Sequence, residues 1–248
     1  FLINATDLIV IYVSLELLSL SSYVLAGFTK LRNRNSEAAL KYLIYGSVSS
    51  GLMLFGISLI FGITGSTNLY VINSLLQTPY TDVIAFTLAV LLVFAGIGYK
   101  ISSVPFHFWT PDVYEGAPIS ITAFLSVASK AAGFALLIRF IKIGFIGFVS
   151  DEGNWSLIPL FDWQSFLILI SILTMTLGNL TALWQDNVKR MLAYSSIAHA
   201  GYLLLGVITM SNQGLIAVLI YFMFYAIMNL GAFYVVMLIA NKTGSENL

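Results

Sequence analysis

Four ionisable side chains lie inside apolar stretches of this chain, where a charge is costly. Glu16, Lys100, Lys130 and His199 are each flanked by hydrophobic or small residues. Charged groups at membrane depth are rare, and they usually pair with one another or mark an ion or proton pathway. Carboxylate, amine and imidazole groups all bind and release protons. These residues therefore predict proton transfer in a low-dielectric interior.

Lys100 lies just before a predicted break in a helix. The apolar run at residues 82–103 is long enough for a helix, and Pro105 follows it. Proline lacks the N–H that would continue the hydrogen-bond ladder, and it disfavours helical backbone at the preceding residue. Broken backbone in a membrane is tolerated only within protein or beside a wet cavity, so we expect Lys100 to face the interior. The segment up to Glu115 either continues the helix or forms a hairpin at the membrane surface.

A pair between Glu16 and Lys100 is the first arrangement we expect. At ~4 Å and an effective dielectric of ~20, the two charges attract by ~4 kcal/mol. Dehydration of a buried lysine opposes its charge by a similar free energy. Two lysines ~10 Å apart repel by only ~1.7 kcal/mol, so opening of the Glu–Lys pair is the stronger control on proton transfer to Lys130. The alternative is a permanent ion pair that only holds two helices together.

The other candidate residues each have a structural alternative. Lys130 lies in SVASKAAG, whose small residues also suit close helix packing. His199, in AYSSIAHAGY, can pass protons onward or can be a buried histidine with satisfied hydrogen bonds. His107, in PFHFW, can transfer protons or bridge an interfacial loop. Asp112 and Glu115 are expected to cap or pin that loop, with proton entry as the alternative role.

The composition predicts an all-α, polytopic transmembrane bundle. The 248 residues are 59% hydrophobic and 9% charged, with a mean hydropathy of +0.93, whereas soluble domains are about a quarter charged. The apolar runs are close to or above the ~20 residues that cross a bilayer. About seven spans are expected, one of them discontinuous, at residues 5–27, 36–62, 82–103 with the break at Pro105, 119 to the 140s, 164–184, about 191–210 and 214–240.

Several classes of site are excluded by composition. The net charge is zero, so nothing indicates a nucleic-acid partner. There is no cysteine, which excludes thiolate-bound iron–sulfur clusters, disulfides and cysteine-based zinc sites. Two histidines are too few for a metal or haem cluster. We therefore expect no metal and no cofactor in this chain. The chain opens inside an apolar stretch without Met, so we expect it to be a piece of a longer protein.

Basic residues collect in connections that alternating helices place on one side of the membrane. These residues are Lys30, Arg32, Arg34 and Lys41 after the first expected helix, Lys189 and Arg190 after the fifth, and Lys242 after the last. The loops at 63–80 and 148–163 have no Lys or Arg. The positive-inside rule then places the start of the chain on the outer side.

Five sequence motifs carry a family resemblance. YKISSVPFHFWTPDVYEGAP, followed by AFLSVASKAAGFALLIR, resembles the antiporter-like membrane subunits of respiratory complex I, nearest to the N subunit, which is subunit 2 in mitochondria. LELLSLSSYVLAG, EAALKYLIYGSVSS and NVKRMLAYSSIAHAGYLLLG fit the same family in the same order. The resemblance covers essentially the whole chain. It implies one transmembrane domain at 1–248, with a nearly complete first inverted-repeat unit at 1–148 and part of a second at 163–240.

The resemblance also implies roles. Glu16 and Lys100 match the Glu–Lys pair of the family, Lys130 matches its central relay lysine, and His199 matches a position that is polar in related subunits. The implied function is a proton-translocating subunit of an NADH (or ferredoxin):quinone oxidoreductase, with neighbouring antiporter-like subunits as partners. Flavin, iron–sulfur clusters and quinone would belong to other subunits. The membrane would be a bacterial cell membrane, or a thylakoid or mitochondrial inner membrane.

Other functions share these features. A subunit of an Mrp-type sodium/proton antiporter, or of an energy-converting membrane hydrogenase, would also have a broken helix and buried lysines. A scaffold whose buried charges only fix helix register is the non-catalytic alternative.

Overall fold

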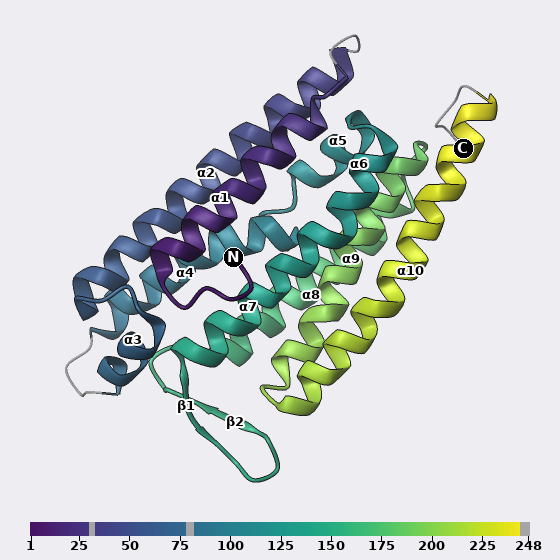
Figure 1. Ribbon diagram of the computed structural model, residues 1–248. Coiled ribbons are helices and arrows are strands. Elements are labelled where there is room, and N and C mark those ends of the chain that lie inside the picture. The colour runs from purple at the N-terminus through teal and green to yellow at the C-terminus, as the bar shows by residue number, and fades with distance from the viewer. Residues whose placement is uncertain (30–32, 78–81, 244–248) are drawn as a thin grey trace.

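Helices make up nearly all the regular structure in the computed structural model, which describes residues 1–29, 33–77 and 82–243 (Figure 1). The helices are α1 Leu8–Ala26, α2 Asn33–Thr64, α3 Leu69–Leu76, α4 Val83–Ile101, α5 Trp109–Gly116, α6 Ile119–Phe124, the π-helical turn η1 Leu125–Ser129, α7 Lys130–Gly144, α8 Trp163–Ala182, α9 Val188–Ile208 and α10 Asn212–Thr243. Seven helical segments of the described chain are long and apolar enough to cross a membrane. The chain is a multi-pass membrane protein, as predicted.

The spans differ in how far the rest of the chain encloses them. The apolar window of α4 is 67% buried and that of α10 is 17% buried. Figure 1 shows α10 along one edge of the bundle and α1 and α2 along the opposite edge. The outward side chains of α10 are large and apolar, which suits contact with lipid or with neighbouring helices. α4 therefore provides the interior on which the candidate site is built.

The predicted break lies where Pro105 places it. α4 ends at Ile101, Ser102 takes a left-handed conformation with φ 61°, and the Val104–Pro105 peptide is cis. The chain then resumes as the short helix α5 at Trp109. Of the two alternatives left open by the sequence, the second segment is a helical continuation.

Protein groups satisfy the backbone at this break. The Ser103 N–H donates to Gly98 O at 2.9 Å. The Val104 N–H donates to the Thr174 hydroxyl of α8 at 3.0 Å, and the Trp109 indole N–H donates to Tyr99 O at 3.0 Å. Broken helices are stable at membrane depth only when such partners are present. The interruption is therefore an interior feature.

Three features were not predicted. The loop expected at 63–80 contains α3, and the loop expected at 148–163 contains most of an antiparallel hairpin of β1 Ile146–Val149 and β2 Trp155–Leu157. The span that begins at Ile119 contains the wide turn η1 directly before Lys130. All three elements are too short for apolar periodicity to identify. Lys30 and Arg32, which supported the predicted sidedness, lie outside the described residues, and the sidedness remains a prediction, as do the repeat-unit boundaries.

Candidate proton-transfer site

Lys100 is buried in the last turn of α4, with 1% of its surface exposed. Its Nζ donates to the Ser19 hydroxyl of α1 at 3.2 Å. Glu16, one turn earlier on α1, interacts electrostatically with Lys100. Its Oε1 is buried without a hydrogen-bond partner among the described residues. The structure therefore brings Glu16 and Lys100 into one region, but the Ser19 hydroxyl, and not the carboxylate, accepts the hydrogen bond from Lys100 Nζ.

Lys130 is equally buried, at 1% exposure, and begins α7 directly after η1. Its Nζ donates to both the carbonyl oxygen and the hydroxyl of Ser196 on α9, each at 2.6 Å. A π-helical turn shifts the helix register by one residue, and such turns are frequent at functional sites. Here the turn comes directly before the lysine, so α7 presents Lys130 toward α9.

The two lysines come from helices in direct contact. A Cβ at Gly133 of α7 would lie 3.4 Å from both Cβ and Cγ of Lys100, and 2.8 Å from Cγ2 of Ile101. Gly133 lies one turn after Lys130 and has no side chain, so α7 can pack directly against the aliphatic part of the Lys100 side chain. The small residues of SVASKAAG serve helix packing and lysine placement together.

The two histidines have different surroundings. His199 of α9 is half-buried, its Nδ1 lies 2.6 Å from the Tyr221 hydroxyl of α10, and it interacts electrostatically with Lys130. His107, in the break, is buried with its ring 4.4 Å from that of Phe108. No hydrogen bond links His107 to either lysine in the described part of the chain, and its Nδ1 is unpaired there. The structure groups His199 with Lys130 and leaves His107 apart.

Buried hydroxyl groups near the break were not identified from the sequence. The hydroxyls of five residues are buried without a hydrogen-bond partner among the described residues: Tyr42 of α2, Ser102 of the break, Thr110 and Tyr114 of α5, and Ser129 of η1. Buried polar groups are nearly always paired, and ordered water is the usual partner where protein offers none. These hydroxyls place unpaired polar groups in the interior close to the break, on α2, α5 and η1.

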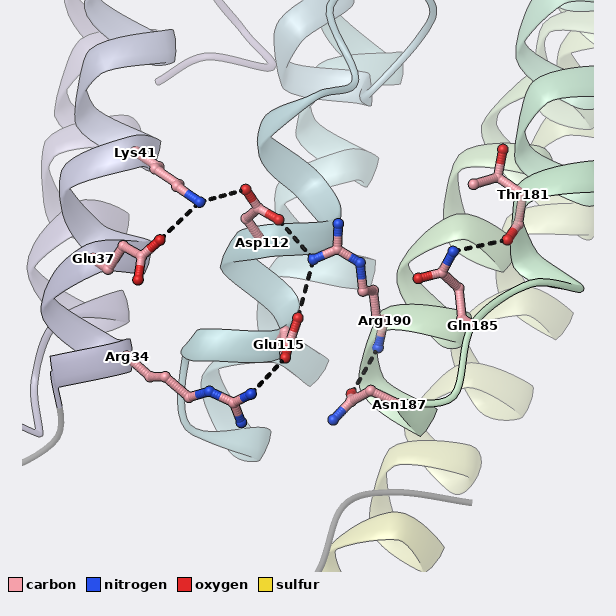
Figure 2. Close-up of polar contacts among 9 residues, drawn as sticks. All are labelled: Arg34, Glu37, Lys41, Asp112, Glu115, Thr181, Gln185, Asn187 and Arg190. Carbon is pink, nitrogen blue, oxygen red and sulfur yellow. Dashed lines mark hydrogen bonds and ion pairs between the residues drawn. The ribbon is translucent and has the colours of Figure 1, made fainter.

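A network of ion pairs fixes α5 to α2 and α9 (Figure 2). Asp112 accepts from Lys41 at 2.8 Å and from Arg190 at 2.7 Å, and Glu115 pairs with Arg34 at 3.1 Å and with Arg190 at 3.0 Å. These residues line a cavity of about 240 Å³. Partial burial opposes ionisation of Asp112, but its bonds from Lys41 and Arg190 outweigh this and hold the pKa of that carboxyl below its ordinary value. The carboxylates pin the segment, as the sequence predicted.

Lys189 was predicted as a residue of a basic turn, but the structure buries it. It lies in the first turn of α9 with 3% exposure, and its Nζ donates to Ala117 O at 3.1 Å. That carbonyl belongs to the link between α5 and α6. Lys189 thus positions the segment that leads to η1.

Among the described residues, no group of three or more His, Cys, Asp or Glu could hold a metal ion.

Known proteins resemble nearly the whole of this chain. The family described as "NADH:quinone oxidoreductase/Mrp antiporter, TM" matches residues 5–248. The chain belongs to this family. A relative named NADH-quinone oxidoreductase subunit N 2, from Chloroherpeton thalassium, is 54% identical over 245 residues, covering 99% of this chain and 47% of the relative. The chain spans about half the length of the curated relatives it matches.

Solved structures of this family share the fold. A chain of respiratory complex I from Thermus thermophilus with bound aureothin matches with a TM-score of 0.75 and 37% identity, covering 94% of this chain and 47% of that one. A chain of the Mrp complex from Dietzia sp. matches with a TM-score of 0.78 and 25% identity, covering 98% of this chain and 25% of that one. The predicted resemblance to antiporter-like subunits is confirmed.

Proposed function

We propose that this chain is part of a proton-translocating membrane subunit of an NADH (or ferredoxin):quinone oxidoreductase, a translocase. The observation that carries the proposal is the burial of Lys100 and Lys130 on contacting helices, with the first beside a broken helix. Ionisable groups at such depth are retained for function by default, because each is costly. The names of the relatives that match nearly all of this chain support the complex in which it works.

In the proposed mechanism, Glu16, Lys100 and Lys130 form the relay. Approach of the Glu16 carboxylate favours the ammonium form of Lys100, and its withdrawal releases a proton toward Lys130. The Ser19 hydroxyl accepts from Nζ of Lys100, and the Ser196 hydroxyl and carbonyl accept from Nζ of Lys130, which is the neutral amine when it receives that proton. His199 is a lower-ranked onward step, because its ring lies 5.0 Å from that of Tyr225, which contacts Ser196 beside Lys130. His107 has no assigned step.

The proposal places redox chemistry in other subunits. Flavin, iron–sulfur clusters and quinone would bind there, and this chain would hold no cofactor. Neighbouring antiporter-like subunits would be its partners, and α10 offers an apolar edge for lipid or such subunits. The start of the chain would lie on the outer side of a bacterial cell membrane, or of the corresponding organellar membrane.

A second candidate function is supported by the likeness to a chain of the Mrp complex. In that case the chain would belong to a sodium/proton antiporter, or to an energy-converting hydrogenase of related build. Co-purification with peripheral iron–sulfur subunits supports the oxidoreductase. Sodium-dependent proton exchange in vesicles without those subunits supports the antiporter.

The relay is tested by Lys100→Ala and Glu16→Ala in the full-length subunit within its assembled complex. A group that transfers protons typically contributes about 10²–10⁴-fold to a rate, so we expect coupled proton pumping to fall by at least about tenfold while assembly survives. Lys142→Ala is the matched control, because Lys142 is an exposed lysine late in α7. Wild-type turnover and pumping in both relay variants would end the relay assignment.

A further inference from the structure

A hydrogen-bonded chain of hydroxyl groups connects Lys130 to α10. The Ser196 hydroxyl, which accepts from Lys130 at 2.6 Å, lies 2.9 Å from the Tyr225 hydroxyl of α10. Tyr225 in turn lies 3.2 Å from the carbonyl oxygen of Ser126 in η1. Tyr225 is buried, at 2% exposure. The outermost helix of the bundle thus reaches the lysine through two hydroxyls and also contacts the turn that presents it.

The direction of these bonds follows from what each group can donate. A carbonyl oxygen only accepts, so the Tyr225 hydroxyl is the donor in its hydrogen bond to Ser126 O. Tyr225 can then only accept from Ser196, so the Ser196 hydroxyl proton points to Tyr225. The Ser196 hydroxyl is left with a lone pair facing Lys130, beside its own carbonyl oxygen.

Asn229, one turn beyond Tyr225 on α10, holds the arrangement. Its Nδ2 donates to the Ser126 hydroxyl at 2.7 Å and to the Tyr225 hydroxyl at 3.2 Å, and it is 5% exposed. The Ser126 hydroxyl donates to Ala123 O at 2.8 Å. The Ser126 and Tyr225 hydroxyls therefore each donate their proton to a carbonyl oxygen, and each can only accept a hydrogen bond from the Asn229 amide. These bonds give the hydroxyl protons of Ser126, Ser196 and Tyr225 one mutually consistent set of directions.

We propose that Tyr225, supported by Asn229, is a positioning residue that turns the Ser196 hydroxyl so that Ser196 presents only acceptors to Lys130. This inference rests on the proposed function. Ser196 can accept a hydrogen bond from Lys130 but cannot give it a proton. A proton that reaches Lys130 therefore does not come from Ser196, and the α4 side, where Lys100 packs against α7, remains open to it. Tyr225 thereby makes proton transfer at Lys130 directional.

The test uses the full-length subunit in its assembled complex and measures protons pumped per NADH oxidised. Tyr225→Phe keeps the ring and removes the hydroxyl. Loss of one hydrogen bond corresponds to a factor of about three to ten, so we expect proton yield to fall by about that factor. Tyr234→Phe makes the same change at an exposed position of the same helix and is expected to pump as wild type.

A double-variant comparison separates positioning from general packing. If Tyr225 acts through Ser196, then Tyr225→Phe adds no further loss in a Ser196→Ala background. If Tyr225→Phe lowers the proton yield as much in the Ser196→Ala background as in the wild type, the inference is overturned. The inference is also overturned if Tyr225→Phe and Tyr234→Phe pump equally well. If Tyr225→Phe does not assemble, Asn229→Ala carries the test: reduced yield supports the inference, and wild-type yield overturns it.

Lys130→Met in the same assay separates the two proposals. Wild-type proton yield in Lys130→Met would contradict the proposed function itself. Loss of yield in Lys130→Met, together with full yield in Tyr225→Phe, would contradict only the positioning role.

Discussion

Replacement of Asp112 by Asn should destabilise the protein through the ion-pair network between α2, α5 and α9. The carboxylate accepts two charge-assisted bonds, 2.8 Å from Lys41 and 2.7 Å from Arg190, and its side chain is 26% exposed. Such bonds contribute about 1.5–3 kcal/mol each when buried. Solvent and the remaining partners Glu37 and Glu115 reduce the loss. We expect Asp112→Asn to lower the free energy of unfolding by about 2 kcal/mol.

The assay is unfolding in mixed micelles by titration with SDS, followed by helix content. Glu37→Gln is the matched control, because it breaks an exposed pair with the same Lys41 at 2.9 Å within one helix. Exposed pairs of this spacing contribute about 0.3–0.5 kcal/mol. Equal effects of the two variants would refute the view that the half-buried position of Asp112 makes its pairs strong.

The same comparison has a defined pH dependence. The pKa of Asp112 is lower in the folded protein than in the unfolded chain, where it is about 3.9. Its contribution to stability is therefore fully present above about pH 5 and is lost as the pH falls through the folded pKa. The stability gap between wild type and Asp112→Asn should close on acidification below about pH 4. A gap that stays constant or widens would contradict this.

Two further predictions concern the helices that support the site. Gly178→Ala should cost about 1–3 kcal/mol of unfolding free energy, because a Cβ there would lie 2.6 Å from the Ala198 backbone N. Gly231→Ala meets open space on α10 and should be neutral or stabilising in the same SDS titration; equal losses in both variants would refute the packing argument. Asp82→Ala should cost about 0.5–2 kcal/mol, because Asp82 caps α4 through Ile84 N at 2.9 Å and Ala85 N at 3.2 Å. Unchanged stability in Asp82→Ala would show that the cap is dispensable.

The spans and the break were predictable because their signals are strong. Each crossing is a long apolar run, and Pro105 has a local steric effect that no tertiary contact removes. The burial of Lys100 and Lys130 followed from the same reasoning, since a lysine in an apolar run must face protein or water.

The contacts of the buried charges were not predictable. Ser19 and Ser196 accept hydrogen bonds from the two lysine Nζ atoms, but serines are common in apolar helices and nothing in their spacing distinguishes these two. The sequence predicted a close Glu16–Lys100 pair, whereas the structure shows an electrostatic interaction with Glu16 and a hydrogen bond to Ser19. The difference depends on the rotation and height of α1 against α4, which side-chain packing sets.

Tertiary contacts also decided the role of residues near the helix ends. The sequence predicts that Lys189 is part of a basic turn. In the structure α9 begins at Val188, and the Lys189 side chain donates to Ala117 O. The turn η1 has no proline or glycine to mark it. Its position is tied to contacts from α10, through Tyr225 and Asn229, which lie about 100 residues away in the sequence.

The most direct test of proton transfer through the buried lysines is the number of protons pumped per NADH by the assembled complex with Lys130→Met. Methionine has a similar length but cannot carry a proton. Lys242→Met, an exposed change at the end of α10, is the control. We predict a lower proton yield in Lys130→Met and a wild-type yield in Lys242→Met. A wild-type proton yield in Lys130→Met would contradict the relay.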